Sequence, residues 1–166
     1  MKTTETKRCR NIRRVLIALF VVCGYLLSTT FISAYVTVDG KEKLITETAL
    51  NLTFGSVSGS TPVYRNTVVG AMYFIIPLVG FLFMFFDHRS NVKNLVGIIC
   101  GIVGCVSIGL PIGSNPDFYM GIGAVVSMLL YTFVTMLSAI SVFMKLEDDR
   151  KNKSPESAPR LQKHET

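Results

Sequence analysis

The chain has 166 residues, of which 49% are apolar and 17% charged, and its formal net charge is +6. This length suits one domain, and the charged fraction is below the roughly one quarter that is typical of soluble domains. The apolar residues are collected into four blocks without Asp, Glu, Lys, Arg or His, which argues against a soluble bundle whose helices keep a polar face. The blocks cover residues 15–38, 68–86, 94–113 and 118–144.

Each block is long enough to cross the hydrocarbon core of a bilayer, which takes about 20 apolar residues. The sequence therefore predicts an all-α membrane protein, a bundle of four transmembrane helices. The first block also fits a cleaved signal peptide, because a basic segment precedes it. Its apolar run is longer than the usual 7–15 or so residues of a signal peptide, and the candidate cleavage site places Ile32 where a small residue is needed, so a membrane anchor is favoured. The helices are expected over about 15–36, 68–86, 94–113 and 118–144, the first becoming extended after about Ile32.

The placement of Lys and Arg predicts the topology. Fourteen of them lie in the N-terminal segment, in the loop between the second and third helices and in the C-terminal tail, whereas three lie in the two loops on the other side. The positive-inside rule assigns the side with fourteen to the cytoplasm. We expect a basic cytoplasmic arm (1–14), a transmembrane domain (15–144) with an exported loop (37–67), and a charged, partly disordered cytoplasmic tail (145–166). With no retention or transit signal, this topology indicates the plasma membrane.

The basic arm also predicts an attraction to lipid. Five basic residues in a stretch of eight lie directly beside the first membrane helix, and near anionic headgroups each contributes about 1 kcal/mol. The bilayer is therefore the expected partner of this positive charge, and no nucleic acid is needed to explain it. The predicted headgroup-binding residues are Lys7, Arg8, Arg10, Arg13 and Arg14.

The exported loop is predicted to contain a β-hairpin. Residues 34–38 and 41–48 are rich in β-branched side chains, and Asp39-Gly40 between them is a strong turn signal because both positions must tolerate positive φ. Residues 49–54 are apolar but short, suited to lying on the membrane surface or capping the bundle. Residues 55–62 have the composition of a loop.

The third helix carries the most specific pattern in the sequence. Small residues recur every four positions along it, with one more glycine beside the row. Helices in lipid associate through close backbone contact, which small residues permit, so this helix is predicted to be the central one. Packing within the chain is favoured over a contact with another protein. A weaker row on the fourth helix is interrupted by Tyr131. The predicted packing residues are Gly97, Gly101, Gly104, Cys105, Gly109 and Gly113.

Several function classes are disfavoured by what the helices lack. Proton-coupled transporters place acids or histidines within the membrane, and haem proteins of this kind need histidine ligands there; the four blocks contain neither. Asp87, His88 and Arg89 stand together at a helix end, where a solvated cap is the favoured interpretation over a catalytic group. We therefore expect neither an enzyme nor a cofactor or metal site.

The order of elements resembles the claudin-type plan of four membrane helices: an exported hairpin after helix 1, a short cytoplasmic loop after helix 2 and a small exported turn after helix 3. The claudin family's first loop carries a Trp and a Cys pair, whereas this chain has no Trp and no Cys in that loop, so the resemblance does not imply a barrier function. The hairpin followed by Ala49-Leu-Asn-Leu-Thr-Phe-Gly55 is also similar to small uncharacterised bacterial four-helix membrane proteins.

Two functional hypotheses follow. The first is a non-enzymatic accessory or scaffold subunit of a membrane complex, which presents the hairpin outside and the charged tail inside, with another membrane protein as its partner. The second is a small oligomeric transporter or channel for an uncharged or small solute. Its path would be lined by the hydroxyl groups of Ser28, Thr29, Thr30 and Ser107.

Overall fold

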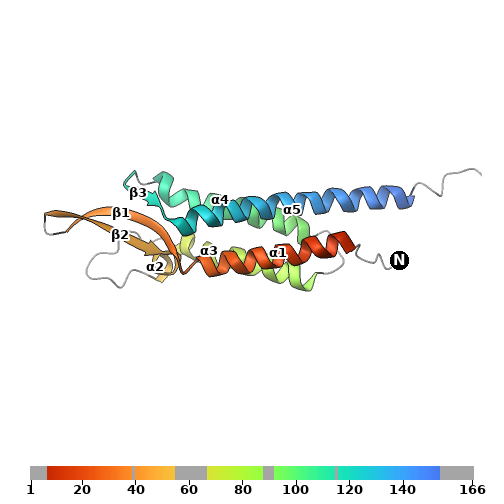
Figure 1. Cartoon of the computed structure of the whole chain (residues 1–166), viewed down its shortest axis with the longest axis horizontal. Coiled ribbons are helices and arrows are strands. Elements are labelled where there is room, and N and C mark those ends of the chain that lie inside the picture. The colour runs from red at the N-terminus through yellow and green to blue at the C-terminus, as the bar shows by residue number, and fades with distance from the viewer. Residues whose placement is uncertain (1–6, 39, 55–66, 88–91, 115, 154–166) are drawn as a thin grey trace, which may run out of the picture.

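The computed structural model describes residues 7–38, 40–54, 67–87, 92–114 and 116–153. Long helices run along the length of the molecule, and a hairpin projects beyond one end of them (Figure 1). The elements in chain order are α1 (Lys7–Leu26), β1 (Thr30–Val38), β2 (Lys41–Thr48), α2 (Ala49–Phe54), α3 (Thr67–Phe86), α4 (Val92–Ser114), β3 (Phe118–Met120) and α5 (Ile122–Lys153). Parts of the predicted arm, exported loop and tail, residues 1–6, 55–66 and 154–166, lie outside the described residues.

Two of the helices are long and apolar enough to cross a membrane, namely Val92–Pro111 within α4 and Ile122–Arg150 within α5. α3 contains a shorter apolar segment, Gly70–Phe86. In α1 the basic residues occupy the first two turns, so that only residues 15–26 are continuously apolar. The described part of the chain is therefore mostly helical and contains two candidate membrane helices, whereas four were expected.

α1 begins and ends earlier than the predicted 15–36. It begins at Lys7, because the stretch of Lys and Arg that was assigned to a separate arm consists of good helix formers. It ends at Leu26, after which Ser28 Oγ donates to the carbonyl of Tyr25 (2.9 Å) and Thr29 Oγ1 to that of Leu26 (2.6 Å). Hydroxyl groups that bond to the backbone in this way compete with helical hydrogen bonds. From Thr30 the chain is a strand.

The predicted hairpin is confirmed. β1 and β2 pair antiparallel, and Gly40 in the turn has a φ of 73°, the left-handed conformation that glycine adopts without strain. The sheet also has a third strand that the sequence did not indicate: β3 pairs antiparallel with β1, which gives the order β2-β1-β3. Residues 118–120 were expected to open the last helix, which instead begins at Ile122.

A β-bulge at Phe31 attaches the hairpin to the helices. The register between β1 and β2 shifts between Thr30 and Ile32. Phe31 is therefore the extra residue of the bulge, and the alternation of side chains between the two faces of β1 is interrupted there. Its ring lies 5.1 Å from that of Tyr73 on α3, centre to centre. The Phe31 carbonyl accepts a hydrogen bond from the backbone N–H of Gly121 (2.8 Å), just before α5. The base of the hairpin around Phe31, which we call the hairpin root, therefore contacts both α3 and the start of α5.

Tyr73 extends this attachment to α4. Its side chain is buried, and its hydroxyl donates to the carbonyl of Ser107 at 3.1 Å. On the other side of the root, the hydroxyl of Thr48 accepts a hydrogen bond from the N–H of Asn51 (3.2 Å) and so caps the short helix α2. At the far end of the molecule α5 continues beyond the other helices (Figure 1).

Replacement of Phe31 tests whether the hairpin root stabilises the whole fold. Phe31 is 1% exposed, so Phe31→Ala leaves a cavity at the junction of three elements and is expected to lower the free energy of unfolding by about 3–5 kcal/mol. Tyr35→Ala, on the same strand but 55% exposed, is the matched control and is expected to cost less than about 1 kcal/mol. Denaturant titration of the purified chain in mild detergent measures both. Equal losses in the two variants would contradict this account.

Candidate functional site

A close helix contact that involves three glycines of the predicted row lies between α4 and α5. A Cβ built on Gly97 would overlap the hydroxyl of Ser138, one on Gly101 would lie 2.8 Å from the carbonyl oxygen of Tyr131, and one on Gly104 would lie 2.8 Å from the Tyr131 ring. Real Cβ atoms do not approach other atoms so closely, so a side chain at any of these positions would displace its neighbour. The constraint is strongest at Gly101, where the neighbour is a backbone carbonyl. We refer to this contact as the α4–α5 seam. It consists of Gly97, Gly101 and Gly104 on α4 and Tyr131, Thr135 and Ser138 on α5.

The other members of the predicted row are placed differently. The Sγ of Cys105 lies 3.6 Å from the carbonyl of Met128 and 3.8 Å from the hydroxyl of Thr132, so it borders the seam. A Cβ on Gly109 or Gly113 would meet no atom of the described structure within 4 Å. The row is thus divided: its first part packs against α5 within the chain, and its last two glycines lie in open space.

The sequence suggested that Tyr131 interrupts the packing face of α5. In the structure Tyr131 is instead part of that face. It is 4% exposed, and its ring lies over Gly104, where the absent side chain makes room for it. Thr135 and Ser138 follow on the same face and meet Gly101 and Gly97. The sequence identified the small residues, but the pairing of a large ring with a glycine on another helix depends on the relative position of the two helices.

Close approaches also occur where the sequence did not point to them. Gly80 on α3 lies against the ring of Phe20 on α1. A Cβ built on Gly70, also on α3, would lie 2.7 Å from the Cα of Thr53 on α2. Gly121 and Gly123 lie against Thr30 and Thr29 at the start of β1. Gly123 opens the weaker small-residue row of the last helix, but no spacing pattern in the sequence marks Gly70, Gly80 or Gly121.

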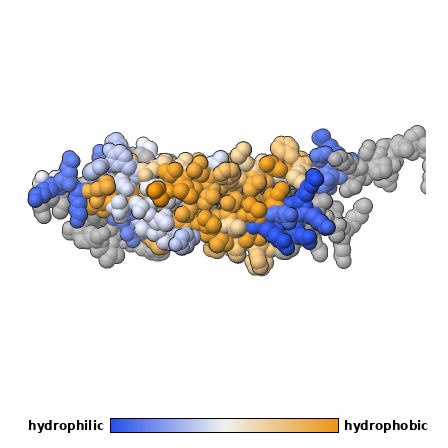
Figure 2. Space-filling view, viewed as in Figure 1, coloured by the Kyte–Doolittle hydropathy of each residue, from blue (hydrophilic) through white to orange (hydrophobic). Residues whose placement is uncertain are grey.

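The predicted headgroup-binding residues gather at the end of α1 that lies away from the hairpin, next to the apolar band (Figure 2). Lys7, Arg8, Arg10 and Arg14 are exposed. Arg13 is partly buried, and its Nη1 donates to the carbonyl of Met84 at the end of α3, at 3.5 Å. Four of the five basic side chains are therefore accessible to a ligand, whereas Arg13 contacts α3.

The hydroxyl groups proposed for a solute path mostly bond to their own helices. Ser28 and Thr29 bond to the carbonyls at the end of α1, and the buried Ser107 donates to the carbonyl of Gly104 at 3.0 Å. Asp87 from the sequence motif at the end of α3 accepts a hydrogen bond from the N–H of Lys93, at the start of α4 (3.3 Å). This bond fits a helix-capping role. His88 and Arg89 lie outside the described residues.

The hairpin presents a partly apolar surface. Tyr35 and Leu44 face each other across β1 and β2 and are 55% and 48% exposed. Tyr119 on β3 extends this surface, since its ring lies edge-on to that of Tyr35 at 5.9 Å. We call Tyr35, Leu44 and Tyr119 the outer sheet face. The tip of the hairpin is charged (Figure 2), and Lys41, Glu42 and Lys43 are all exposed there.

Comparison with known proteins gave no match: no protein-family model, no curated protein and no solved structure is similar to this chain. Within the described ranges, no three or more His, Cys, Asp or Glu side chains come together in a group that could hold a metal ion. The candidate functional features of the described residues are therefore two exposed surfaces, the basic end of α1 and the outer sheet face, and one internal contact, the α4–α5 seam.

A comparison of two glycines from one row tests the seam. Gly101→Leu forces a side chain into Thr135 and the Tyr131 backbone, and is expected to lower stability by about 1–3 kcal/mol or more. Gly109→Leu, eight residues further along the same row, adds the same side chain where the described structure has open space and is expected to stay near the wild type. Thermal unfolding in mild detergent distinguishes them. A larger loss for the Gly109 variant would place the close contact on another part of α4.

Proposed function

We propose that this chain is an integral protein of the plasma membrane in which α1, α3, α4 and α5 form a four-helix transmembrane bundle with both termini in the cytoplasm. In this proposal it is a non-enzymatic accessory or scaffold subunit, whose sheet is presented outside to another membrane protein. The observation that carries the membrane assignment is the distribution of polarity across the helices.

The helices have apolar exteriors and several polar groups inside. Large apolar side chains are exposed along each of the long helices, for example Val21 (55%), Ile75 (55%), Ile99 (52%) and Phe133 (55%). An apolar band crosses the middle of the face that Figure 2 shows. In water such a band would be an unusually large exposed apolar surface. The buried residues include Ser107, Ser127, Ser138 and Ser141. Lipid as the surrounding solvent accounts for both features.

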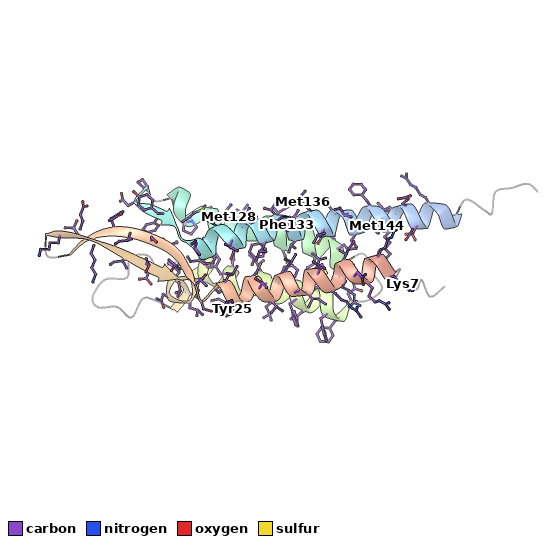
Figure 3. The ribbon with its side chains drawn as sticks, in the orientation of Figure 1. Lys7, Tyr25, Met128, Phe133, Met136 and Met144 are labelled. Carbon is purple, nitrogen blue, oxygen red and sulfur yellow. The ribbon has the colours of Figure 1, made fainter. Side chains whose placement is uncertain are left out.

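The ends of the band support the orientation. Figure 3 shows Tyr25 at the hairpin end of α1 and Lys7 at its other end, with Met128, Phe133, Met136 and Met144 placed along α5. Tyrosine favours the membrane interface and lysine the cytoplasmic side. Residues 122–144 of α5, at about 1.5 Å per residue, span about 34 Å, enough for the hydrocarbon core.

α1 needs an additional argument because its apolar part, residues 15–26, spans only about 18 Å. Long basic side chains can extend their charged ends to the interface while their methylene groups remain in the apolar layer. The exposed Arg10 and Arg14 have this freedom. We therefore include α1 among the membrane helices and assign its basic residues to anionic headgroups.

The scaffold function is preferred over the transporter or channel because of the two surfaces concerned. The outer sheet face is exposed and aromatic, and aromatic residues are enriched in protein interfaces. By contrast, the hydroxyl groups of Ser28, Thr29 and Ser107 already donate to backbone carbonyls, which suits helix ends and helix packing better than a solute path.

Labelling from the two sides of the membrane tests the topology. In a chain whose four cysteines are replaced by alanine, Lys41→Cys at the hairpin tip is expected to react with an impermeant maleimide in intact cells, and Asp149→Cys on α5 only after permeabilisation. Their reaction from the same side would contradict four crossings.

Co-purification tests the scaffold function. From mild detergent, the wild-type chain is expected to be recovered with a partner, and the double variant Tyr35→Ala/Tyr119→Ala with at least about tenfold less of it, because both aromatic anchors of the interface are removed. Tyr25→Ala is the control, since Tyr25 is 72% exposed but lies outside the sheet. Wild-type chain recovered reproducibly alone would count against a scaffold.

A further inference from the structure

Glu47 on β2 is a buried carboxylate that has no hydrogen-bond partner among the described residues. Its side chain is 4% exposed, and neither Oε1 nor Oε2 accepts a hydrogen bond in the described part of the chain. The other acidic residues that the structure describes are half-buried or exposed. Burial of an unpaired charge is costly, and proteins usually compensate for it with a paired group or a bound cation. We therefore expect a cationic group, referred to below as the counterpart, to pair with the Glu47 carboxylate.

The strand pairing shows what surrounds this carboxylate. Glu47 is directly opposite Ile32 on β1, so the two side chains lie on the same face of the sheet. The next pair on that face is Ala34 with Ile45, and both Ile32 and Ala34 are 3% exposed. β1 covers one side of β2, and no strand pairs with its other side among the described residues. The carboxylate thus lies on an apolar face, with both oxygens buried, next to the edge of β2 that no described strand pairs with.

Protection of this edge against aggregation does not explain Glu47. Charged residues on edge strands discourage pairing with other chains because they remain hydrated. Lys41, Glu42 and Lys43, at the tip end of the same strand, are exposed and fulfil this role there, whereas residues 44–48 carry no exposed charge. Glu47 is buried and therefore differs from them.

A divalent metal ion is a poor counterpart, because it needs several oxygen ligands. The side chains paired with or adjacent to Glu47 on this face, Ile32, Ala34 and Ile45, offer none. A cation with an apolar stem fits better. The side chains of lysine and arginine have this composition, since their methylene groups pack on apolar surface while the charged end binds a carboxylate.

A second copy of the chain in the same membrane does not supply this cation by in-register pairing of the two β2 strands. The strands run along the length of the molecule (Figure 1), so two copies with the same orientation would align their β2 strands parallel. In-register pairing then places like charges opposite each other, Glu47 included, which is unfavourable. Antiparallel pairing about Leu44 would place Lys41 opposite Glu47, but it requires an inverted copy. The counterpart is therefore sought on a different protein.

We propose that Glu47 binds a lysine or arginine side chain of a partner membrane protein, carried on an extended segment that adds to the free edge of β2. This inference rests on the proposed scaffold function and specifies the chemistry of the partner. A residue opposite Glu47 on an added strand has its Cβ about 4.5–5.5 Å away. A charge-assisted hydrogen bond between them requires the buried Glu47 side chain to turn toward the added strand. Backbone hydrogen bonds along the strand edge supply affinity, and the buried carboxylate supplies selectivity for a basic residue.

The first experiment uses the purified full-length chain and n-butylguanidinium as a probe of the carboxylate. The probe is expected to raise the midpoint of thermal unfolding of the wild type and to do so with at least about tenfold weaker apparent affinity for Glu47→Gln. Glu42→Gln, which changes an exposed carboxylate of the same strand, is the matched control and should respond as the wild type does. An equal response of the Glu47 variant would overturn the proposal.

A second variant reports whether Glu47 is already paired within the chain. Without the probe, Glu47→Met is expected to be at least as stable as the wild type, because it replaces an unpaired buried charge by an apolar side chain of similar length. A clear loss of stability would show that the carboxylate stabilises this chain by itself, and would overturn the proposal.

The third measurement separates this inference from the scaffold function. A photo-crosslinking amino acid at Thr46, an exposed position of β2, is expected to link the chain to its partner in cells, with at least about tenfold less product in Glu47→Gln than in Glu42→Gln. A partner captured equally by both variants would leave the scaffold function intact and refute the role of Glu47. If the wild-type chain captures no partner and purifies alone, the scaffold function itself fails, and this inference with it.

Discussion

The close approach of α4 to α5 is the contact on which the arrangement of the other elements depends. Three glycines remove the side chains that would hold the two helices apart, and Tyr131, Thr135 and Ser138 occupy the space. In the proposed lipid environment, where apolar side chains gain little from leaving the solvent, contact at this distance would be the main source of helix association. Once α4 and α5 are fixed in this way, α3 packs against α4, and α1 packs against α3 and α5.

The hairpin is held by the same helices through a small number of specific groups. Phe31 packs against Tyr73, Tyr73 bonds to the backbone of α4, and the chain before α5 bonds to the backbone at Phe31. The sheet is therefore continuous with the helices, and a partner bound to the outer sheet face or to the edge of β2 would act on α3, α4 and α5 through Phe31 and Tyr73. This continuity is the structural basis for the proposed scaffold function.

Local signals in the sequence were sufficient for the long helices α3, α4 and α5 and for the hairpin, since apolar runs and an Asp-Gly turn are properties of adjacent residues. They were not sufficient for the end of α1, where the bonds of Ser28 and Thr29 to the backbone compete with an apolar pattern that continues into β1. β3 was missed because three residues carry little pattern, and their strand conformation depends on pairing with β1. Among the candidate residues, the spacing of the glycines indicated a packing face. The spacing could not show that Gly109 and Gly113 lie beyond the contact. The burial of Glu47 could not be predicted either, because it depends on how β2 pairs with β1.

The contact between Gly104 and Tyr131 also restricts how this sequence can diverge. Any side chain at position 104 meets the Tyr131 ring, whereas a smaller residue at position 131 alone would leave a void beneath α4. Each single change is therefore harmful, but the two together can compensate, because the added volume on one helix replaces the volume lost on the other. Related sequences should accordingly show either a glycine with a large ring or a larger residue with a small one at this pair of positions, and intermediates between the two combinations should be rare.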